Sequence, residues 1–286
     1  MHNSIKLGSR SITEKSKPYI IAEIGVNHEG SIEKAKELIE LAKLGGADAA
    51  KFQSYKANKL ASKFSPSYWD ISKEKTKSQY ELFKKYDTFS ENDYQHLAKY
   101  CKKLEIEFLS TPFDKEAIDF LDEIMPFYKI ASADINNIPF LRSIAAKSKP
   151  IILSTGASNL SEIDQAIRTI KNISNSDIAI LHCILNYPTP NKNANLSMIS
   201  GLKKNYPQNI IGYSDHTVPD INMTPLTVAY LKGAVILEKH FTDNKKLPGN
   251  DHYHAMDIDD LKLFKNKINY LDELIGLETE KKQIPE

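Results

Sequence analysis

Residues 234–242 read Ala-Val-Ile-Leu-Glu-Lys-His-Phe-Thr, so four apolar residues are followed directly by three ionisable ones. The apolar half is typical of a buried β-strand. Glu238, Lys239 and His240 would be costly to bury without partners. The strand therefore either reaches solvent at once or delivers these side chains to a site.

Short β-branched runs of this kind recur along the chain and alternate with amphipathic segments. A period of about 3.6 in the apolar residues predicts helices over residues 31–45, 159–173, 221–233 and 257–275. Such alternation implies parallel strands with helical crossovers, and eight units favour a single closed (β/α)₈ TIM barrel of the α/β class. The eight predicted strands are 19–25, 47–54, 107–112, 127–132, 150–155, 179–184, 210–216 and 234–242.

A doubly wound open sheet is the alternative fold. Such a sheet usually has a glycine-rich phosphate turn after its first strand, but residues 25–30, Gly-Val-Asn-His-Glu-Gly, do not match G-x-G-x-x-G. We expect one domain over residues 1–286, with the barrel over about 19–275 and an insertion at 55–90. This insertion is charged and aromatic, and so long a connection is expected to be functional or partly helical. Asp114 and Asp257, each followed by acidic residues, indicate helix starts.

Composition excludes several classes of protein. The chain has 38 basic and 37 acidic residues, a formal net charge of +1, which predicts no nucleic-acid partner and no anionic membrane surface. Two cysteines do not form a disulfide framework, so a reducing compartment is expected, and Cys183 in an apolar run is interpreted as a core residue. The N-terminus lacks an apolar signal region, and no run approaches roughly 18 apolar residues. We therefore expect a cytoplasmic protein.

Polar residues gather where the predicted strands end, which in a barrel is where active sites lie. One set combines ammonium groups with hydroxyl donors, a combination that suits a phosphate or carboxylate. Each member alone could instead satisfy local backbone or extend to solvent, but the set on neighbouring strands favours an anion site. Its members are Lys51, Ser110, Thr111, Lys129, Ser132, Ser154 and Ser214.

A second set is the pair His216 and His240, which end neighbouring strands. Parallel strands lie about 4.8 Å apart, so the imidazoles could converge on a Mn, Fe, Co or Zn ion, although each could also be a structural residue. Asp251, after Pro-Gly, is either a third ligand, a substrate contact or a turn residue. Glu23, inside an apolar strand, is either functional or an ion-pair partner of Lys51.

Eight ordered motifs resemble the sialic acid synthases, that is, the N-acetylneuraminate synthases and their pseudaminic and legionaminic acid relatives. The resemblance covers roughly residues 19–275. The motifs are IIAEIGVNHEG (20–30), KFQ (51–53), STPF (110–113), YKIAS (128–132), ILSTG (152–156), YPTP (187–190), GYSDHT (212–217) and LEKHFT (237–242).

The resemblance implies condensation of phosphoenolpyruvate with an open-chain N-acetylhexosamine, such as N-acetylmannosamine. The product would be a nine-carbon 2-keto-3-deoxy sugar acid, with release of phosphate. A divalent metal, commonly Mn²⁺ with Mg²⁺ or Co²⁺ as alternatives, would be held by His216 and His240. The implied phosphoenolpyruvate ligands are Lys51, Thr111, Lys129, Ser132, Ser154 and Ser214. Glu23, Gln53 and Asp134 would be catalytic, and Tyr187, Asn186 and Asp251 would contact the sugar.

The chain departs from the family pattern in three places. Asp134 stands where several members have Glu, and a family asparagine that contacts the sugar is either replaced or shifted to Asn186. Typical members continue into a small antifreeze-like domain, whereas this sequence ends where that domain's linker would begin, at 283–286. The sequence could be truncated, the antifreeze-like domain could be a separate protein, or this could be a barrel-only variant in which the insertion covers the site instead. A homodimer through the barrel is expected. The alternative functions are a different metal-dependent barrel aldolase and a non-catalytic sugar-binding barrel.

Overall fold

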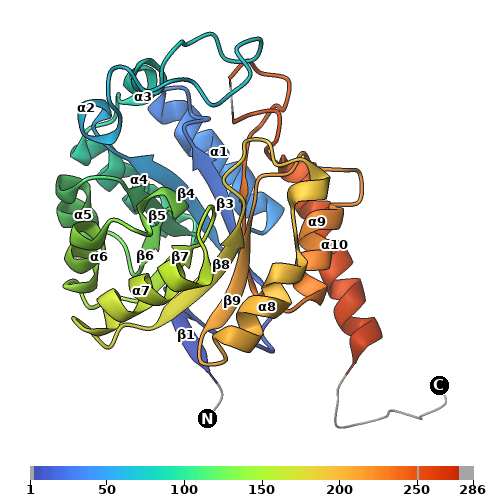
Figure 1. Cartoon of the computed structure of the whole chain (residues 1–286). Coiled ribbons are helices and arrows are strands. Elements are labelled where there is room, and N and C mark those ends of the chain that lie inside the picture. The colour runs from blue at the N-terminus through green and yellow to red at the C-terminus, as the bar shows by residue number, and fades with distance from the viewer. Residues whose placement is uncertain (1–2, 250, 277–286) are drawn as a thin grey trace.

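Eight parallel strands form the centre of the protein in a computed structural model that describes residues 3–249 and 251–276. Hydrogen bonds join them in the order β5-β4-β3-β10-β9-β8-β7-β6, and β5 packs against β6, so the sheet nearly closes (Figure 1). The predicted (β/α)₈ barrel is confirmed. The strands are β3 (Tyr19–Gly25), β4 (Ala49–Ser54), β5 (Glu107–Pro112), β6 (Tyr128–Ile130), β7 (Ile151–Ser154), β8 (Ile178–Cys183), β9 (Ile210–Asp215) and β10 (Ile236–His240).

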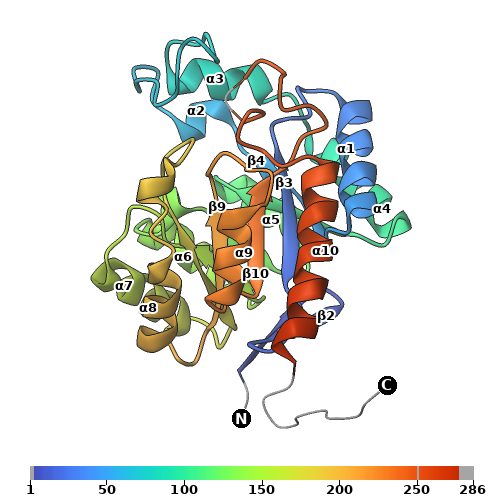
Figure 2. The same cartoon turned by 90° about the vertical axis from the view of Figure 1, so that its right-hand side faces the viewer.

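Helices surround this barrel and bury their apolar stripes against the outer faces of the strands (Figures 1 and 2). Asp114 and Asp257 cap α5 and α10 by accepting hydrogen bonds from first-turn backbone N–H groups, which confirms both predicted helix starts. The helix α9 begins at Thr224, with a proline in its first turn, rather than at 221. The surrounding helices are α1 (Ile32–Gly45), α4 (Glu91–Lys103), α5 (Lys115–Asp122), α6 (Ile138–Ala145), α7 (Leu160–Lys171), α8 (Ser197–Asn205), α9 (Thr224–Leu231) and α10 (Ile258–Ile275).

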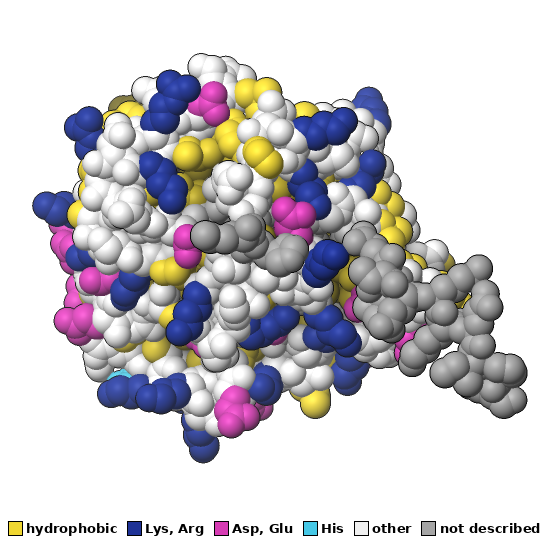
Figure 3. All heavy atoms as spheres, turned by 90° about the horizontal axis from the view of Figure 1, so that it is seen from below, with side chains coloured by type: hydrophobic (Ala, Val, Ile, Leu, Met, Phe, Trp, Pro, Cys, Tyr) yellow, Lys and Arg dark blue, Asp and Glu magenta, His cyan; other side chains and the backbone are white. Residues whose placement is uncertain are grey.

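A hairpin that the sequence analysis did not predict lies at the N-terminal end of the barrel strands. It consists of β1 (Ser4–Leu7) and β2 (Arg10–Thr13), and it buries Ile5, Leu7 and Ile12. The views agree that it closes the bottom of the barrel (Figures 1 and 2). Seen from below, basic and acidic side chains are interspersed over this face rather than gathered into one basic stripe (Figure 3).

The opposite end of the barrel is covered by two connections. The segment 55–90 contains α2 (Ala57–Leu60) and α3 (Gln79–Tyr86), and the segment 241–257 joins β10 to α10. Both lie above the C-terminal ends of the strands (Figure 1). None of the described helices is long and apolar enough to cross a membrane. The expected linker start at 283–286 lies outside the described residues.

Candidate active site

The three ionisable residues that end β10 divide between the two faces of the strand. Because side chains alternate along a strand, Glu238 and His240 point into the barrel, and both line an inner cavity there. Lys239 points outward, where its Nζ lies 2.8 Å from Asp215 Oδ2 and donates to the backbone oxygen of Thr217 at 2.6 Å. All of them are buried, so Lys239 is paired within the fold while its two neighbours serve the inner cavity.

The inner cavity, of about 70 Å³, lies at the ends of the barrel strands and has a charged lining. Lys51 Nζ lies 2.5 Å from Glu23 Oε2 and 3.6 Å from Glu238 Oε2, and it donates to Thr111 Oγ1 at 3.0 Å. Lys129 Nζ lies 3.4 Å from Glu238 Oε1. The structure therefore brings two buried ammonium groups together on either side of one carboxylate.

This arrangement shifts the protonation of the buried groups. Burial would raise the pKa of Glu238, but Lys129, Lys51 and the hydroxyl of Ser214 hold it at about 2, so this carboxylate is ionised. Burial raises the pKa of Glu23, and Lys51 offsets this only in part. Burial also lowers the pKa of Lys129, despite the nearby charge of Glu238. Glu23 is thus more easily protonated than an ordinary glutamate, which suits a proton carrier.

The predicted hydroxyl donors surround the same cavity, with one exception. Ser214 Oγ donates to Glu238 Oε1 at 2.9 Å, and Ser132 Oγ accepts from the backbone N–H of Gly156 at 2.9 Å. Ser154 Oγ is buried without a hydrogen-bond partner among the described residues, so it is available to a bound oxygen atom. Ser110 was wrongly included in this set, because it points to the opposite face of β5 and pairs with Ser54 at 2.7 Å.

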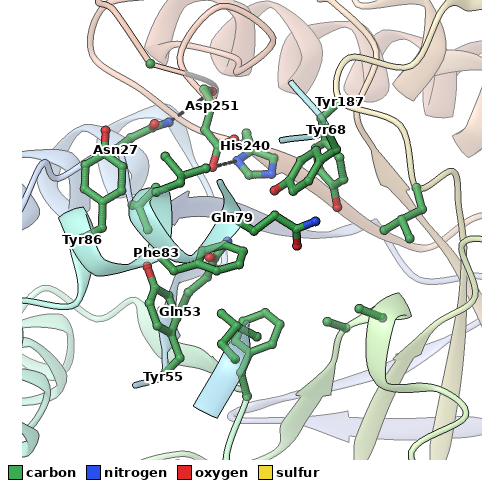
Figure 4. Close-up of a pocket in the computed structure, with 18 of the residues that line it drawn as sticks. Asn27, Gln53, Tyr55, Tyr68, Gln79, Phe83, Tyr86, Tyr187, His240 and Asp251 are labelled. Atoms are coloured by element: carbon green, nitrogen blue, oxygen red, sulfur yellow. Dashed lines mark hydrogen bonds and ion pairs between the residues drawn. The ribbon is translucent and has the colours of Figure 1, made fainter. Parts of the chain in front are cut away.

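A larger cavity of about 440 Å³ lies above the inner one, and its lining is mostly aromatic and amide side chains. Tyr55, Tyr68, Gln79, Phe83 and Tyr86 point into it from the insertion (Figure 4). The predicted sugar contacts Asn186, Tyr187 and Asp251 line the same space, as does Gln53. The two cavities share Gln53, Phe113, Ala131, Ser132, Tyr187 and His240, so they meet at one junction.

Histidines gather at this junction. The ring centroids of His216 and His240 lie 5.6 Å apart, so the predicted pair is close in space. His216 Nδ1 lies 2.9 Å from the backbone oxygen of Ile184, a contact that leaves Nε2 as the available lone pair if Nδ1 carries the proton. The ring of Tyr187 covers His216 with centroids 4.1 Å apart. A third histidine, His254, has its ring 4.8 Å from that of His240.

One predicted catalytic residue stands apart from both cavities. Asp134 ends the short 3₁₀ helix η1 (Ser132–Asp134), accepts a hydrogen bond from Asn137 Nδ2 at 3.3 Å, and lines neither cavity. Burial raises the pKa of its carboxyl group. Its catalytic role stays a prediction from the resemblance alone.

In addition to the side chains of the insertion, three polar residues around the inner cavity and in the histidine cluster were not among the predicted site residues. Glu238 carries a signal in the sequence, because it is two positions from His240 and must point the same way. Cys183, interpreted as a core residue, is buried but lines the inner cavity, with Sγ 3.8 Å from His216 Nδ1. His254 comes from the segment after β10, where no strand periodicity indicates its direction.

The fold and the site together define a TIM barrel that combines a buried pocket, lined by two lysines and two glutamates, with a histidine cluster at the C-terminal ends of its strands. Residues 38–280 match the NeuB family, and the chain belongs to that family.

Among its relatives, an uncharacterized protein of Methanocaldococcus jannaschii is 40% identical, over 95% of this chain and 76% of that protein. The N,N'-diacetyllegionaminic acid synthase of Legionella pneumophila is 39% identical, over 96% of this chain and 76% of that enzyme. Among solved structures, the N-acetylneuraminic acid synthetase of Leptospira borgpetersenii, in complex with citrate, matches with a TM-score of 0.86 and 32% identity. That match covers 99% of this chain and 93% of the other.

Proposed function

We propose that this protein condenses phosphoenolpyruvate with an open-chain N-acetylhexosamine to a nine-carbon 2-keto-3-deoxy sugar acid and releases phosphate. The observation that supports it most is the pair of buried ammonium groups, Lys51 and Lys129, in a small cavity that opens into a larger aromatic one. The names of relatives such as the Legionella pneumophila synthase point to the same class of product.

In this proposal the inner cavity binds phosphoenolpyruvate. Buried ammonium groups bind carboxylate and phosphate oxygens strongly because little water competes with them. Lys51 and Lys129 supply these charges, and Thr111, Ser132, Ser154 and Ser214 supply hydroxyl groups around them. The acceptor sugar occupies the outer cavity against Tyr187, Asn186 and Asp251, with its aldehyde end at the junction.

The reaction forms one carbon–carbon bond, adds the oxygen of water to C2 and breaks the bond between C2 and the phosphate oxygen. C3 of phosphoenolpyruvate attacks the aldehyde carbon, whose oxygen takes up a proton, and C2 becomes cationic. The ionised carboxylate of Glu238 stabilises positive charge in this cavity. Water then adds at C2 and gives up a proton, for which Glu23 is the proposed acceptor, with Gln53 donating to Glu23 Oε1 at 3.0 Å. The C2 hydroxyl group that came from water then loses its proton to the departing phosphate as the bond between C2 and the phosphate oxygen breaks, which releases phosphate and leaves the ketone.

The histidine cluster fits a divalent metal ion. His240 Nδ1 is buried and has no hydrogen-bond partner among the described residues, and Asp251 Oδ2 lies 3.8 Å from it, beyond hydrogen-bonding distance. Imidazole nitrogens suit Mn²⁺ and related ions. His216 and His240 are the predicted holders, and a bound ion would supply Lewis-acid polarisation of the aldehyde oxygen. Mn²⁺ is the proposed metal.

A panel of N-acetylhexosamines incubated with phosphoenolpyruvate tests the proposed function. We expect phosphate release that requires both substrates and stops when a chelator removes the metal, with activity restored by added Mn²⁺. A metal-dependent aldolase would instead act without phosphoenolpyruvate and release no phosphate. A sugar-binding barrel would bind an acceptor and release none with any member of the panel. Either result would overturn the proposal.

The outer cavity predicts an unphosphorylated acceptor. No lysine or arginine is among the described residues that line it, so a phosphate on the end of the sugar that points away from the histidine cluster would find no cationic side chain. An unpaired charged group costs at least about 1.4 kcal/mol, or about tenfold in kcat/KM. N-acetylmannosamine should therefore exceed its 6-phosphate by about tenfold or more, as measured by phosphate release.

The variant Gln79→Lys provides a matched test of this preference. Gln79 points into the middle of the outer cavity (Figure 4), so a lysine there would offer the missing positive charge. In this variant, the ratio of kcat/KM for N-acetylmannosamine to kcat/KM for its 6-phosphate should be smaller than in the unaltered protein. Equal or greater kcat/KM for the sugar phosphate in the unaltered protein would contradict the prediction.

A further inference from the structure

Three potential ligands that the sequence separates come together beside the junction of the two cavities. Ligand atoms of His240, Asp251 and His254 all lie within 4.8 Å of one another. His240 ends β10, while Asp251 and His254 belong to the segment that follows it, spaced as H-x₁₀-D-x₂-H. Ligand atoms around a single first-row ion are roughly 3–4 Å apart, given metal–ligand distances of about 2.1 Å. Small side-chain shifts would therefore place all three on one ion.

The segment that carries Asp251 and His254 is fixed at both of its ends. Met256 donates its backbone N–H to the oxygen of His240 at 2.8 Å, and Thr242 donates to the oxygen of Met256 at 3.0 Å. Within the segment, Thr242 Oγ1 lies 2.8 Å from His252 Nδ1. From the other side, Asn27 Nδ2 donates to the backbone oxygen of Phe241 at 3.0 Å and to that of Asp251 at 3.4 Å. Asn27 and Asp251 face each other at this edge of the outer cavity (Figure 4). The backbone that presents the potential ligands is therefore braced by β10 and by the loop after β3.

We propose that His240, Asp251 and His254 form a binding site for a divalent transition-metal ion. This set shares His240 with the histidine pair implied by the family resemblance and adds ligand roles for His254 and Asp251, which that resemblance does not imply. It deepens the metal requirement of the proposed function, yet it does not depend on the reaction. Two imidazoles and one carboxylate with remaining open positions favour ions such as Fe²⁺, Mn²⁺ and Co²⁺. Mg²⁺ prefers all-oxygen ligands and should bind more weakly.

The location of the three residues defines what the open coordination positions would face. His240 lines both cavities and Asp251 lines the outer one, whereas His254 is completely buried behind them. An ion between them would be held from the protein side by His254 and would face the junction on its other side. The ring of Tyr187, 6.2 Å from that of His240 and 6.0 Å from that of His254, lies over the same group.

Direct metal binding to the purified, metal-stripped full chain tests this assignment without any substrate. The loss of the free Mn²⁺ signal in electron paramagnetic resonance measures affinity. We expect His254→Ala and Asp251→Asn each to weaken Mn²⁺ binding by at least about tenfold, because changes to groups beyond the direct ligands already cost about 10- to 100-fold. The absorption spectrum of bound Co²⁺ should also change in both variants, since the ligand set changes. His96→Ala, an exposed histidine on α4, is the control and should bind as the unaltered protein does.

The outcomes separate this assignment from the proposed function. Mn²⁺ affinity equal to that of the unaltered protein in both His254→Ala and Asp251→Asn, with an unchanged Co²⁺ spectrum, would overturn it. Circular dichroism and thermal melting of the metal-free variants identify any that fails to fold, and the conservative Asp251→Asn keeps the test decisive in that case. Loss of Mn²⁺ binding in these variants would support the assignment even if no sugar released phosphate from phosphoenolpyruvate.

Discussion

Lys129→Met is expected to weaken phosphoenolpyruvate binding roughly 30-fold to several thousand-fold, while the KM for the acceptor sugar stays unchanged within error. Lys129 is 3% exposed and lies 3.4 Å from Glu238 Oε1 in the inner cavity. In the proposed complex Lys129 pairs with an anionic oxygen of phosphoenolpyruvate. Truncating one member of such a buried charge pair costs about 2–5 kcal/mol of binding free energy, which corresponds to the stated range in affinity. Methionine fills most of the lysine volume, so the loss reports on charge rather than on a cavity.

Separate titrations of the two substrates in the phosphate-release assay measure this effect, and equilibrium binding of phosphoenolpyruvate checks it independently. Lys262→Met, on the exposed face of α10, is the control and should leave both KM values unchanged. Equal losses for phosphoenolpyruvate and for the sugar would show that Lys129 does not bind phosphoenolpyruvate selectively.

In the unaltered protein, kcat/KM for phosphoenolpyruvate should fall as alkaline pH deprotonates Lys129. Because burial lowers the pKa of Lys129, this fall should begin at a lower pH than it would for a lysine with an ordinary pKa.

The fold could be predicted because each strand carries its own signal. The apolar runs at 19–25 and 107–112 coincide with β3 and β5, while the predicted strand at 234–242 shortens to Ile236–His240. The hairpin of β1 and β2 escaped prediction because two four-residue strands rich in polar residues show little periodicity. The hairpin is stabilised by the burial of Ile5, Leu7 and Ile12 against the barrel. This tertiary packing is not encoded in the local periodicity of the sequence.

The site could be predicted to the extent that the strand ends determine it. Parallel strands place Lys51, Lys129 and His240 at the same end of the barrel, and the structure brings them together there. The prediction that Ser110 belongs to the set around the cavity was wrong, because adjacent residues of a strand point to opposite faces and Ser110 and Thr111 therefore could not both face the cavity. The same alternation, applied to β10, would have selected Glu238 together with His240. No periodicity argument reaches His254, because the course of the segment after β10 depends on contacts such as those of Asn27.

The ion pair on the outer face of the barrel gives the second large expected effect. Lys239→Met should lower the free energy of unfolding by about 3–5 kcal/mol, because removing one partner leaves the other charge buried and uncompensated. Both side chains are about 1% exposed, and Lys239 Nζ lies 2.8 Å from Asp215 Oδ2. Chemical denaturation of the metal-free protein measures the loss, with Lys262→Met as the exposed control. The double variant Asp215→Asn/Lys239→Met should recover most of it, since neither charge then remains.

The pH dependence of stability separates loss of the ion pair from a simple packing defect. Burial would raise the pKa of Asp215, but Lys239 and the Thr217 donors hold it below its ordinary value. In the unaltered protein, Asp215 thus binds a proton less readily in the folded state than in the unfolded state. Its carboxylate therefore contributes to the free energy of unfolding above the unfolded pKa, and this contribution is lost as pH falls through the lower folded pKa. In Lys239→Met, burial should dominate and raise that pKa above the unfolded value, so the sign reverses and acidification recovers stability. A packing defect would lower stability by the same amount at every pH, and a loss below about 1 kcal/mol at neutral pH would contradict the ion-pair argument.

Because Asp215 precedes His216 and Lys239 precedes His240, this pair links β9 to β10 directly beneath the two histidines. The same variant should therefore also weaken Mn²⁺ binding, although Lys239 points away from the cavity.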